Sequence, residues 1–279
     1  RMEEINFRGY TETEKLEIAR RHLLPKAMEQ AGIQKEDLEI SEEILKKIIE
    51  DYTAEAGVRG LKKRLDAVCR SAAVRLVKGA DTPVCVKEEE LSAFFDMQPF
   101  YHEKLLTPDR PGIVTGLAWT QGGGEILFIE TMFTKGKGEC VITGQLGDVM
   151  KESAQIAVSL VKDLFPDQEE LFENNDLHIH VPAGAVPKDG PSAGITLTTA
   201  LASLVTGRIV NPKYAMTGEV SLKGRLMPIG GLPEKLMAAV RAGVKKVFIP
   251  KENVRDLPEV PQEIRDQLKI VPVQKVTEV

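Results

Sequence analysis

The residue pattern changes near position 100, and this change limits what the chain can fold into. Residues 1–100 contain five glycines, whereas residues 101–279 contain eighteen. The first region carries apolar residues at helical spacing, and the second alternates strand-like with helix-like segments. This order predicts a helical domain over residues 1–96, a proline-containing linker over 97–111, and an α+β (mixed α/β) domain over 112–279.

Within the first region, capping patterns and apolar stripes predict the helices. Thr11 and Glu14 have the spacing of a capping box, and Ser41 is placed to cap another helix. The longest helix is expected after Gly57. Its apolar side chains recur every three or four residues, at Val58, Leu61, Leu65, Val68, Ala72 and Leu76.

In the second region, strands and helices are expected in alternation. Strand-like segments cover 113–119, 125–130, 139–143, 177–181, 214–217, 247–249 and 270–273. Helical patterns cover 148–164, 192–205 and 232–242.

Composition excludes several classes of protein. Hydrophobic residues make up 42% and charged residues 28%, which is typical of a globular chain, and the net charge of −5 does not favour nucleic acid as a first partner. No stretch approaches the roughly 18 apolar residues that a membrane span needs. Three separated cysteines without CxxC favour a reducing, cytoplasmic compartment. The first residues do not resemble a signal peptide, and we expect a piece of a longer protein.

Common catalytic and nucleotide-binding motifs are missing. The sequence has no GxxxxGK[ST] loop, no GxGxxG between a strand and a helix, no GxSxG and no HExxH. A phosphate-binding loop, a Rossmann site and a zincin site are therefore not expected in this chain.

The most informative segment is VPKDGPSAG, residues 186–194. Two prolines and two glycines restrict this loop, and a helix is expected at or beside Ser192. A serine there lies among unpaired amides at the positive end of a helix dipole, where an oxyanion can be stabilised. Ser192 is therefore either a nucleophile or only the cap of the helix.

A serine nucleophile needs a base, and the sequence offers two kinds. His178 and His180 alternate along one strand and share a face. Three interpretations of the two histidines are open. One of them is a base for Ser192, the pair binds zinc with Asp189 as the nearest third ligand in sequence, or both are partly buried polar side chains. We expect an accessory role for both and no metal.

Lys235 is the other candidate base. It follows the glycine turn of GGLPEK, residues 230–235, in the first turn of a helix, near the edge of an apolar face. A lysine there is normally a surface cation. To act as a base it must be buried, so that its pKa falls from about 10.4 to about 7–8.

These motifs together resemble the Lon family of ATP-dependent AAA+ proteases. The serine of PKDGPSAG and the lysine of GGLPEK lie 43 residues apart, and further matching segments are GLAW (116–119), TGQLGDVMKESA (143–154), TGEVSLKGRLMPIGG (217–231) and KKVFIPKEN (245–253). In the first region, GYTETEKLEIARRHLLPK (9–26) and EAGVRGLKKRL (55–65) resemble the small helical AAA+ subdomain. The resemblance implies a helical AAA+ small subdomain followed by a Lon-type protease domain.

The resemblance also assigns roles to individual residues. It implies that Ser192 is the nucleophile and Lys235 the general base of a Ser–Lys dyad, with Thr217 bonded to the lysine amine. It implies supporting positions for three other side chains near the site, Asp189, His178 and His180. Arg59 matches the sensor-2 arginine, which contacts nucleotide.

Cofactors and partners follow from the same resemblance. In the full-length protein it implies ATP with Mg²⁺, a hexameric ring, and unfolded or damaged proteins as substrates. The chain itself is not expected to bind ATP tightly. Weak DNA binding through Lys62, Lys63, Arg64 and Arg70 stays open, as do an assembly module with a dormant site and a metallohydrolase at His178 and His180.

Overall fold

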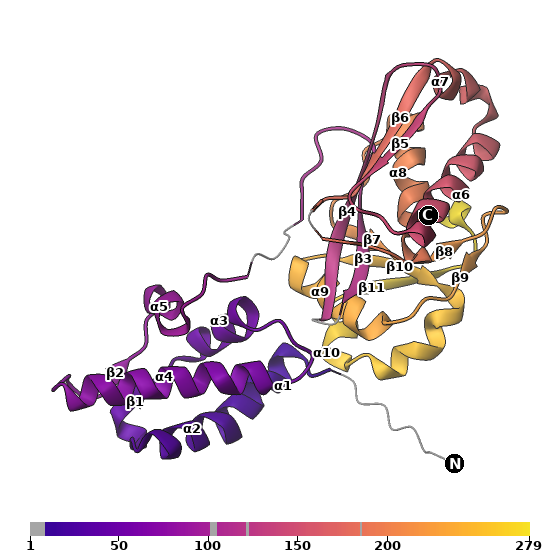
Figure 1. The fold of residues 1–279 in the computed structure, drawn as a ribbon. Coiled ribbons are helices and arrows are strands. Elements are labelled where there is room, and N and C mark those ends of the chain that lie inside the picture. Colours follow the sequence, from indigo (N-terminus) through magenta and orange to yellow (C-terminus); the bar gives the residue numbers. More distant parts are fainter. Residues whose placement is uncertain (1–8, 101–104, 121–122, 185) are drawn as a thin grey trace, which may run out of the picture. The chain divides into compact units, whose positions relative to one another are not determined.

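The computed structural model describes residues 9–100, 105–120, 123–184 and 186–279. Residues 101–104 of the predicted linker lie outside the described residues. The chain falls into two compact units, one formed mainly by the residues before this segment and one mainly by the residues after it (Figure 1). A helical unit is followed by an α+β unit, as predicted.

The first unit consists of helices around one core. These are α1 (Glu12–Ile18), continued by a π-helical segment into α2 (Leu24–Ala31), then α3 (Glu42–Tyr52), α4 (Arg59–Val77) and α5 (Leu91–Phe95). The predicted capping box is present, because the Glu14 amide donates to Thr11 Oγ1 and the Thr11 amide to Glu14 Oε2. Ser41 caps α3 through the Ile44 amide.

The long helix α4 fills this core with the predicted stripe. Leu61, Leu65, Val68 and Ala72 are buried there. A short parallel pair, β1 (Leu38–Glu39) with β2 (Val84–Cys85), closes the unit. Each strand has two residues, too few to show a period in the sequence.

The second unit is built on a seven-stranded sheet in the order β11-β10-β7-β3-β4-β6-β5. Its strands are β3 (Ile113–Thr120), β4 (Gly123–Lys135), β5 (Cys140–Thr143), β6 (Asn175–His180), β7 (Tyr214–Met216), β10 (Lys246–Pro250) and β11 (Lys269–Val273). Strand β6 pairs antiparallel with β4 and parallel with β5, so the sheet is mixed. A separate antiparallel pair is formed by β8 (Glu219–Val220) and β9 (Leu226–Met227).

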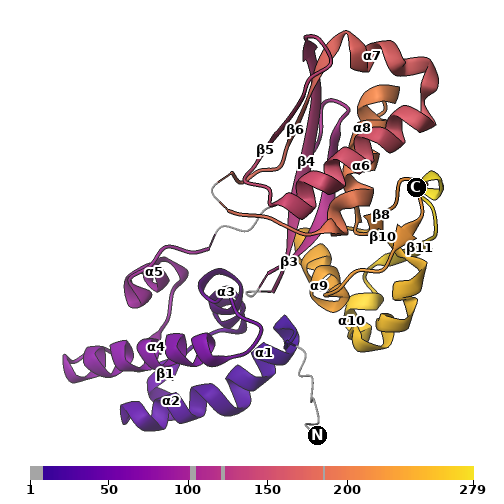
Figure 2. The same ribbon diagram turned by 45° about the vertical axis from the view of Figure 1, so that its right-hand side comes forward.

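Helices cover both faces of the sheet (Figures 1 and 2). Along β4, Leu127 and Ile129 belong to one core, and Ile126 and Phe128 belong to another. Successive side chains of a strand point to opposite faces. The first core also contains side chains of α6 (Asp148–Leu164) and α8 (Gly194–Thr206), and the second those of α9 (Leu232–Ala242) and α10 (Gln262–Arg265).

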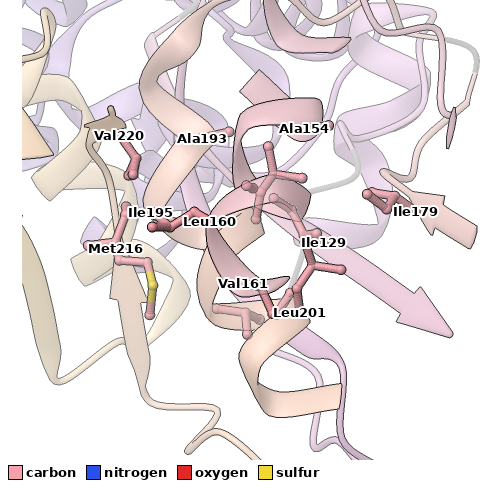
Figure 3. Close-up of a cluster of buried hydrophobic side chains, with 14 of the residues drawn as sticks. Ile129, Ala154, Leu160, Val161, Ile179, Ala193, Ile195, Leu201, Met216 and Val220 are labelled. Atoms are coloured by element: carbon pink, nitrogen blue, oxygen red, sulfur yellow. The ribbon is translucent and has the colours of Figure 1, made fainter. Parts of the chain in front are cut away.

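The core around α6 and α8 reaches the residue next to Ser192. Ala193 is buried in this cluster together with Ala154 of α6 and Ile195 of α8 (Figure 3). The helix predicted from 192 begins two residues later, because Pro191–Ala193 form a single 3₁₀ turn before α8. The short helix α7 (Glu169–Glu173) was not expected from the sequence. Across the described ranges, no helix combines the length and apolar character that crossing a bilayer requires.

Candidate active site

Lys235 lies inside the protein on the first turn of α9. The helix starts after Gly231, which has φ 67°, and Pro233 occupies its first turn. Only 3% of Lys235 is exposed, among the buried side chains of Leu232 and Leu236. The interpretation as a surface cation is therefore wrong. Burial lowers the pKa of Lys235 to about 8, because the charged amine loses its hydration.

Thr217 holds the amine of this lysine. Lys235 Nζ donates to Thr217 Oγ1 at 3.1 Å, and Thr217 itself is 0% exposed. This is the contact that the resemblance implies. Thr217 Oγ1 in turn donates to the carbonyl oxygen of Ser192 at 3.4 Å.

Ser192 is half-buried in the 3₁₀ turn before α8, and its hydroxyl does not cap that helix. The N-cap of α8 is Ala193, without a side-chain hydrogen bond, so the interpretation of Ser192 as a simple cap is wrong. The Gly218 amide donates to the Ser192 carbonyl at 2.8 Å and fixes its main chain beside Thr217.

The serine and lysine thus meet at one threonine rather than in direct contact. No hydrogen bond joins Ser192 Oγ to Lys235 Nζ, both of which lie in the described part of the chain. Catalytic hydrogen bonds are often long without substrate and tighten when it binds.

Asp189 stabilises the loop before Ser192 through main-chain amides. Its Oδ1 accepts from the Met150 amide at 3.0 Å and from the Gly190 amide at 2.8 Å. A Cβ on Gly147 would lie 2.3 Å from the Asp189 carboxyl carbon, so any side chain there would displace this carboxylate. The carboxylate therefore occupies the N-terminus of α6, where a negative charge is favourable.

His178 and His180 lie on one face of β6, as predicted, and share a partner. Thr143 Oγ1 lies 2.9 Å from His178 Nε2 and 2.7 Å from His180 Nδ1. Both imidazoles and Ser192 belong to the described residues, and no hydrogen bond joins them. Among the residues that the structure describes, no three His, Cys, Asp or Glu side chains come together to hold a metal ion. Asp189 contacts amides instead of these histidines.

Arg59 is the exposed first residue of α4 in the helical unit. The Glu55 carboxylate accepts from the Gly60 amide at 2.7 Å and the Leu61 amide at 2.8 Å. Two amides at the start of α4 are therefore already hydrogen-bonded to a carboxylate, and the Arg59 side chain is exposed.

Two close packings around α9 were missed in the sequence. A Cβ on Gly124 would lie 1.9 Å from the carbonyl oxygen of Glu234, so β4 touches the first turn of α9 directly. Trp119, 59% exposed, lies against Gly231, where a Cβ would be 3.0 Å from the indole. The run of three glycines at 122–124 is the one sequence signal for such an approach.

Comparison with known proteins identifies both units. Residues 29–84 match the family model of the Lon protease AAA+ ATPase lid domain, and residues 85–279 match that of the Lon protease (S16) C-terminal proteolytic domain. Lon protease of Methanosarcina barkeri is 51% identical over all of this chain, that of Clostridium beijerinckii 52%, and that of Brucella suis 48%. The chain covers 35% of the length of each relative.

The fold and these matches show an AAA+ lid followed by a proteolytic domain of a serine peptidase family. The chain belongs to the Lon protease family.

Proposed function

We propose that this chain hydrolyses peptide bonds with Ser192 as nucleophile and Lys235 as general base. The burial of Lys235, which is 3% exposed, is the observation that carries the proposal, because burial lowers the pKa of this amine to about 8. At pH 7.5 such an amine is neutral in about a quarter of the molecules, against about 0.1% for an ordinary lysine. Burial thus supplies a few hundredfold more of the basic form.

The proposed reaction moves one proton between the two side chains. The Ser192 hydroxyl rotates toward Lys235 Nζ and gives up its proton, and Oγ attacks the substrate carbonyl. Main-chain amides at the turn of Ser192 stabilise the oxyanion. The ammonium then protonates the leaving amine as the C–N bond breaks. Neutral Lys235 next takes a proton from water, the hydroxide attacks the acyl ester, and the ammonium returns the proton to Ser192 Oγ as the ester C–O bond breaks.

Supporting side chains have separate tasks in this proposal. Thr217 accepts one N–H of the amine, which leaves the nitrogen lone pair free to face Ser192. Asp189 holds the preceding loop on α6. His178 and His180 act as accessory residues bonded to Thr143.

Cleavage of a short unstructured fluorogenic peptide without ATP tests the proposal. The unmodified chain should cleave it, and Ser192→Ala and Lys235→Arg should be inactive, because a guanidinium does not release its proton at working pH. Lys245→Arg is the control, since Lys245 is exposed. Turnover near normal in Lys235→Arg would refute the base assignment. A serine-directed boronate that fails to bind at Ser192 would favour an assembly module with a dormant site.

For the full-length protein we propose ATP-dependent proteolysis of unfolded or damaged proteins by a hexameric ring in the cytoplasm. Arg59 fits a single contact to the phosphates of ATP–Mg²⁺, since its side chain is exposed while Glu55 takes the helix amides. The sequence has no phosphate-binding loop, so tight binding needs residues beyond this chain. We also propose that the helical subdomain covers residues 1–96, the linker 97–111 and the proteolytic domain 112–279.

Weak DNA binding through Lys62, Lys63, Arg64 and Arg70 is a second candidate function beside peptide hydrolysis. Lys62 is paired with Asp66 at 2.8 Å, and Arg64 donates to the Tyr52 carbonyl, so two of the four cations have partners within the unit. Lys63 and Arg70 are exposed. A mobility shift that weakens with salt measures this activity.

A further inference from the structure

Lys188, four residues before Ser192, has its ammonium group among main-chain carbonyls. Its Nζ donates to Ala183 O at 2.6 Å, Val186 O at 3.0 Å, and to Gly144 O and Val181 O at 3.2 Å each. An ammonium has three N–H groups, so four carbonyls share three donors.

Four carbonyl oxygens that converge on one point favour a cation between them. Their dipoles repel one another when the centre is empty, and each oxygen then loses a charge-assisted hydrogen bond. Burial lowers the pKa of Lys188, because the ammonium loses part of its hydration there.

The carbonyls come from two separate parts of the chain. Gly144 directly follows β5, and Val181 directly follows β6. The main chain of Lys188 is tied to the same turn, since its amide donates to Gln145 O at 3.1 Å and its carbonyl accepts from the Gly147 amide at 2.7 Å. Side chain and main chain of Lys188 therefore join the end of β6 to the turn after β5.

Residues 189–191 connect this junction to Ser192. Asp189 is bonded to the Met150 amide, and the Pro191 carbonyl accepts from Ser153 Oγ at 3.4 Å. Residues 188–191 are thus fixed to α6 and to the turn before it. Ala183 and Val186 are exposed, and their carbonyl oxygens accept hydrogen bonds from Lys188 Nζ.

We propose that Lys188 is a positioning residue of the proposed peptidase, whose ammonium holds the end of β6 against the Gly144 turn and thereby sets the position of Ser192. The inference rests on the proposed function, and it assigns Lys188 no contact with the reacting atoms.

Truncation with chemical rescue tests it. Lys188→Ala removes the three outer methylenes and the ammonium, which together correspond to n-propylammonium. We expect kcat on the unstructured peptide to fall at least tenfold, the scale of a misplaced catalytic group, while KM changes less than about threefold. Added n-propylammonium should restore part of kcat with saturation. Tetramethylammonium, which has no N–H, and neutral propanol should not. The exposed Lys223→Ala is the matched control.

Full activity of Lys188→Ala overturns the proposal, as does a folded, inactive Lys188→Ala that no amine restores. If Lys188→Ala does not fold, its refolding yield is compared in n-propylammonium and in tetramethylammonium. A higher yield in n-propylammonium supports the role of the Lys188 ammonium, and equal yields overturn it.

Amide exchange separates this inference from the proposed function. In a Ser192→Ala background, Lys188→Met should speed exchange of the Val181 amide, bonded to Thr143 O, and of the Val186 amide, bonded to Ala183 O. Unchanged exchange overturns the role of Lys188 even if the chain proves to have no peptidase activity.

Discussion

Replacing Lys235 by methionine should inactivate the protein and at the same time stabilise it. Methionine keeps a stem of similar length and removes the buried ammonium. The pKa of Lys235 falls from 10.5 to about 8 on folding. This lowering by roughly 2.5 pKa units reduces the free energy of unfolding by about 3 kcal/mol at pH 7. At that pH Lys235 carries its proton in both states, but only the folded state holds the charge in a dry site.

The sign follows from the lowered pKa. Below pH 8 the folded state carries the full cost of charging Lys235, and this cost disappears as pH rises from about 8 to 10.5. The methionine variant also loses the hydrogen bond to Thr217, which reduces its gain in stability by about 1 kcal/mol. We therefore expect Lys235→Met to be more stable by about 2 kcal/mol at pH 7, and to lose this advantage near pH 10.

Urea unfolding followed by tryptophan fluorescence measures the difference. The chain has one tryptophan, Trp119 on β3, so the signal reports the second unit alone. Lys245→Met, at an exposed lysine, should change stability by less than about 0.5 kcal/mol at either pH. A Lys235→Met protein that is less stable than the parent by the same amount at pH 7 and pH 10 would contradict a destabilising buried ammonium at Lys235.

Two further substitutions test how the amine is placed. Gly124→Ala puts a Cβ 1.9 Å from the Glu234 carbonyl oxygen, so the first turn of α9 must move by about 1 Å. We expect peptidase kcat to fall roughly a hundredfold. In the control Gly230→Ala the new Cβ has no neighbour within 4 Å, and kcat should be unchanged. Equal activities of the two variants would contradict this packing. Thr217→Val removes the acceptor of Lys235 Nζ and should lower kcat at least tenfold. Its pH–rate midpoint should stay within about one unit of the parent's, because burial and not this bond lowers the pKa; a larger change would assign the shift to Thr217.

Local signals in the sequence predicted much of the fold. The capping box at Thr11 and the stripe of α4 depend on residues close in sequence, and both are confirmed. Strand β1, with two residues, has no period to detect, and exists through its pairing with β2. Helix α7 was missed because five residues are too few for a 3.6-residue period.

For the site, residue type was visible in the sequence and environment was not. A lysine at the edge of an apolar stripe is normally exposed, and Lys235 is buried because the sheet and the neighbouring Thr217 cover it. The contacts of Lys188 are to main-chain carbonyls, which leave no pattern in the side chains. The close approach of Gly124 to α9 likewise joins segments 110 residues apart.

The most direct test of the account is the pKa of the Lys235 amine. Lysine labelled with ¹³C at Cε gives one NMR signal for each side chain, and Lys235→Arg identifies the signal of Lys235. Titration of the chain without substrate should give a midpoint of about 8 for this signal. A midpoint near the ordinary value of about 10.4 would contradict a lysine that serves as the base for Ser192.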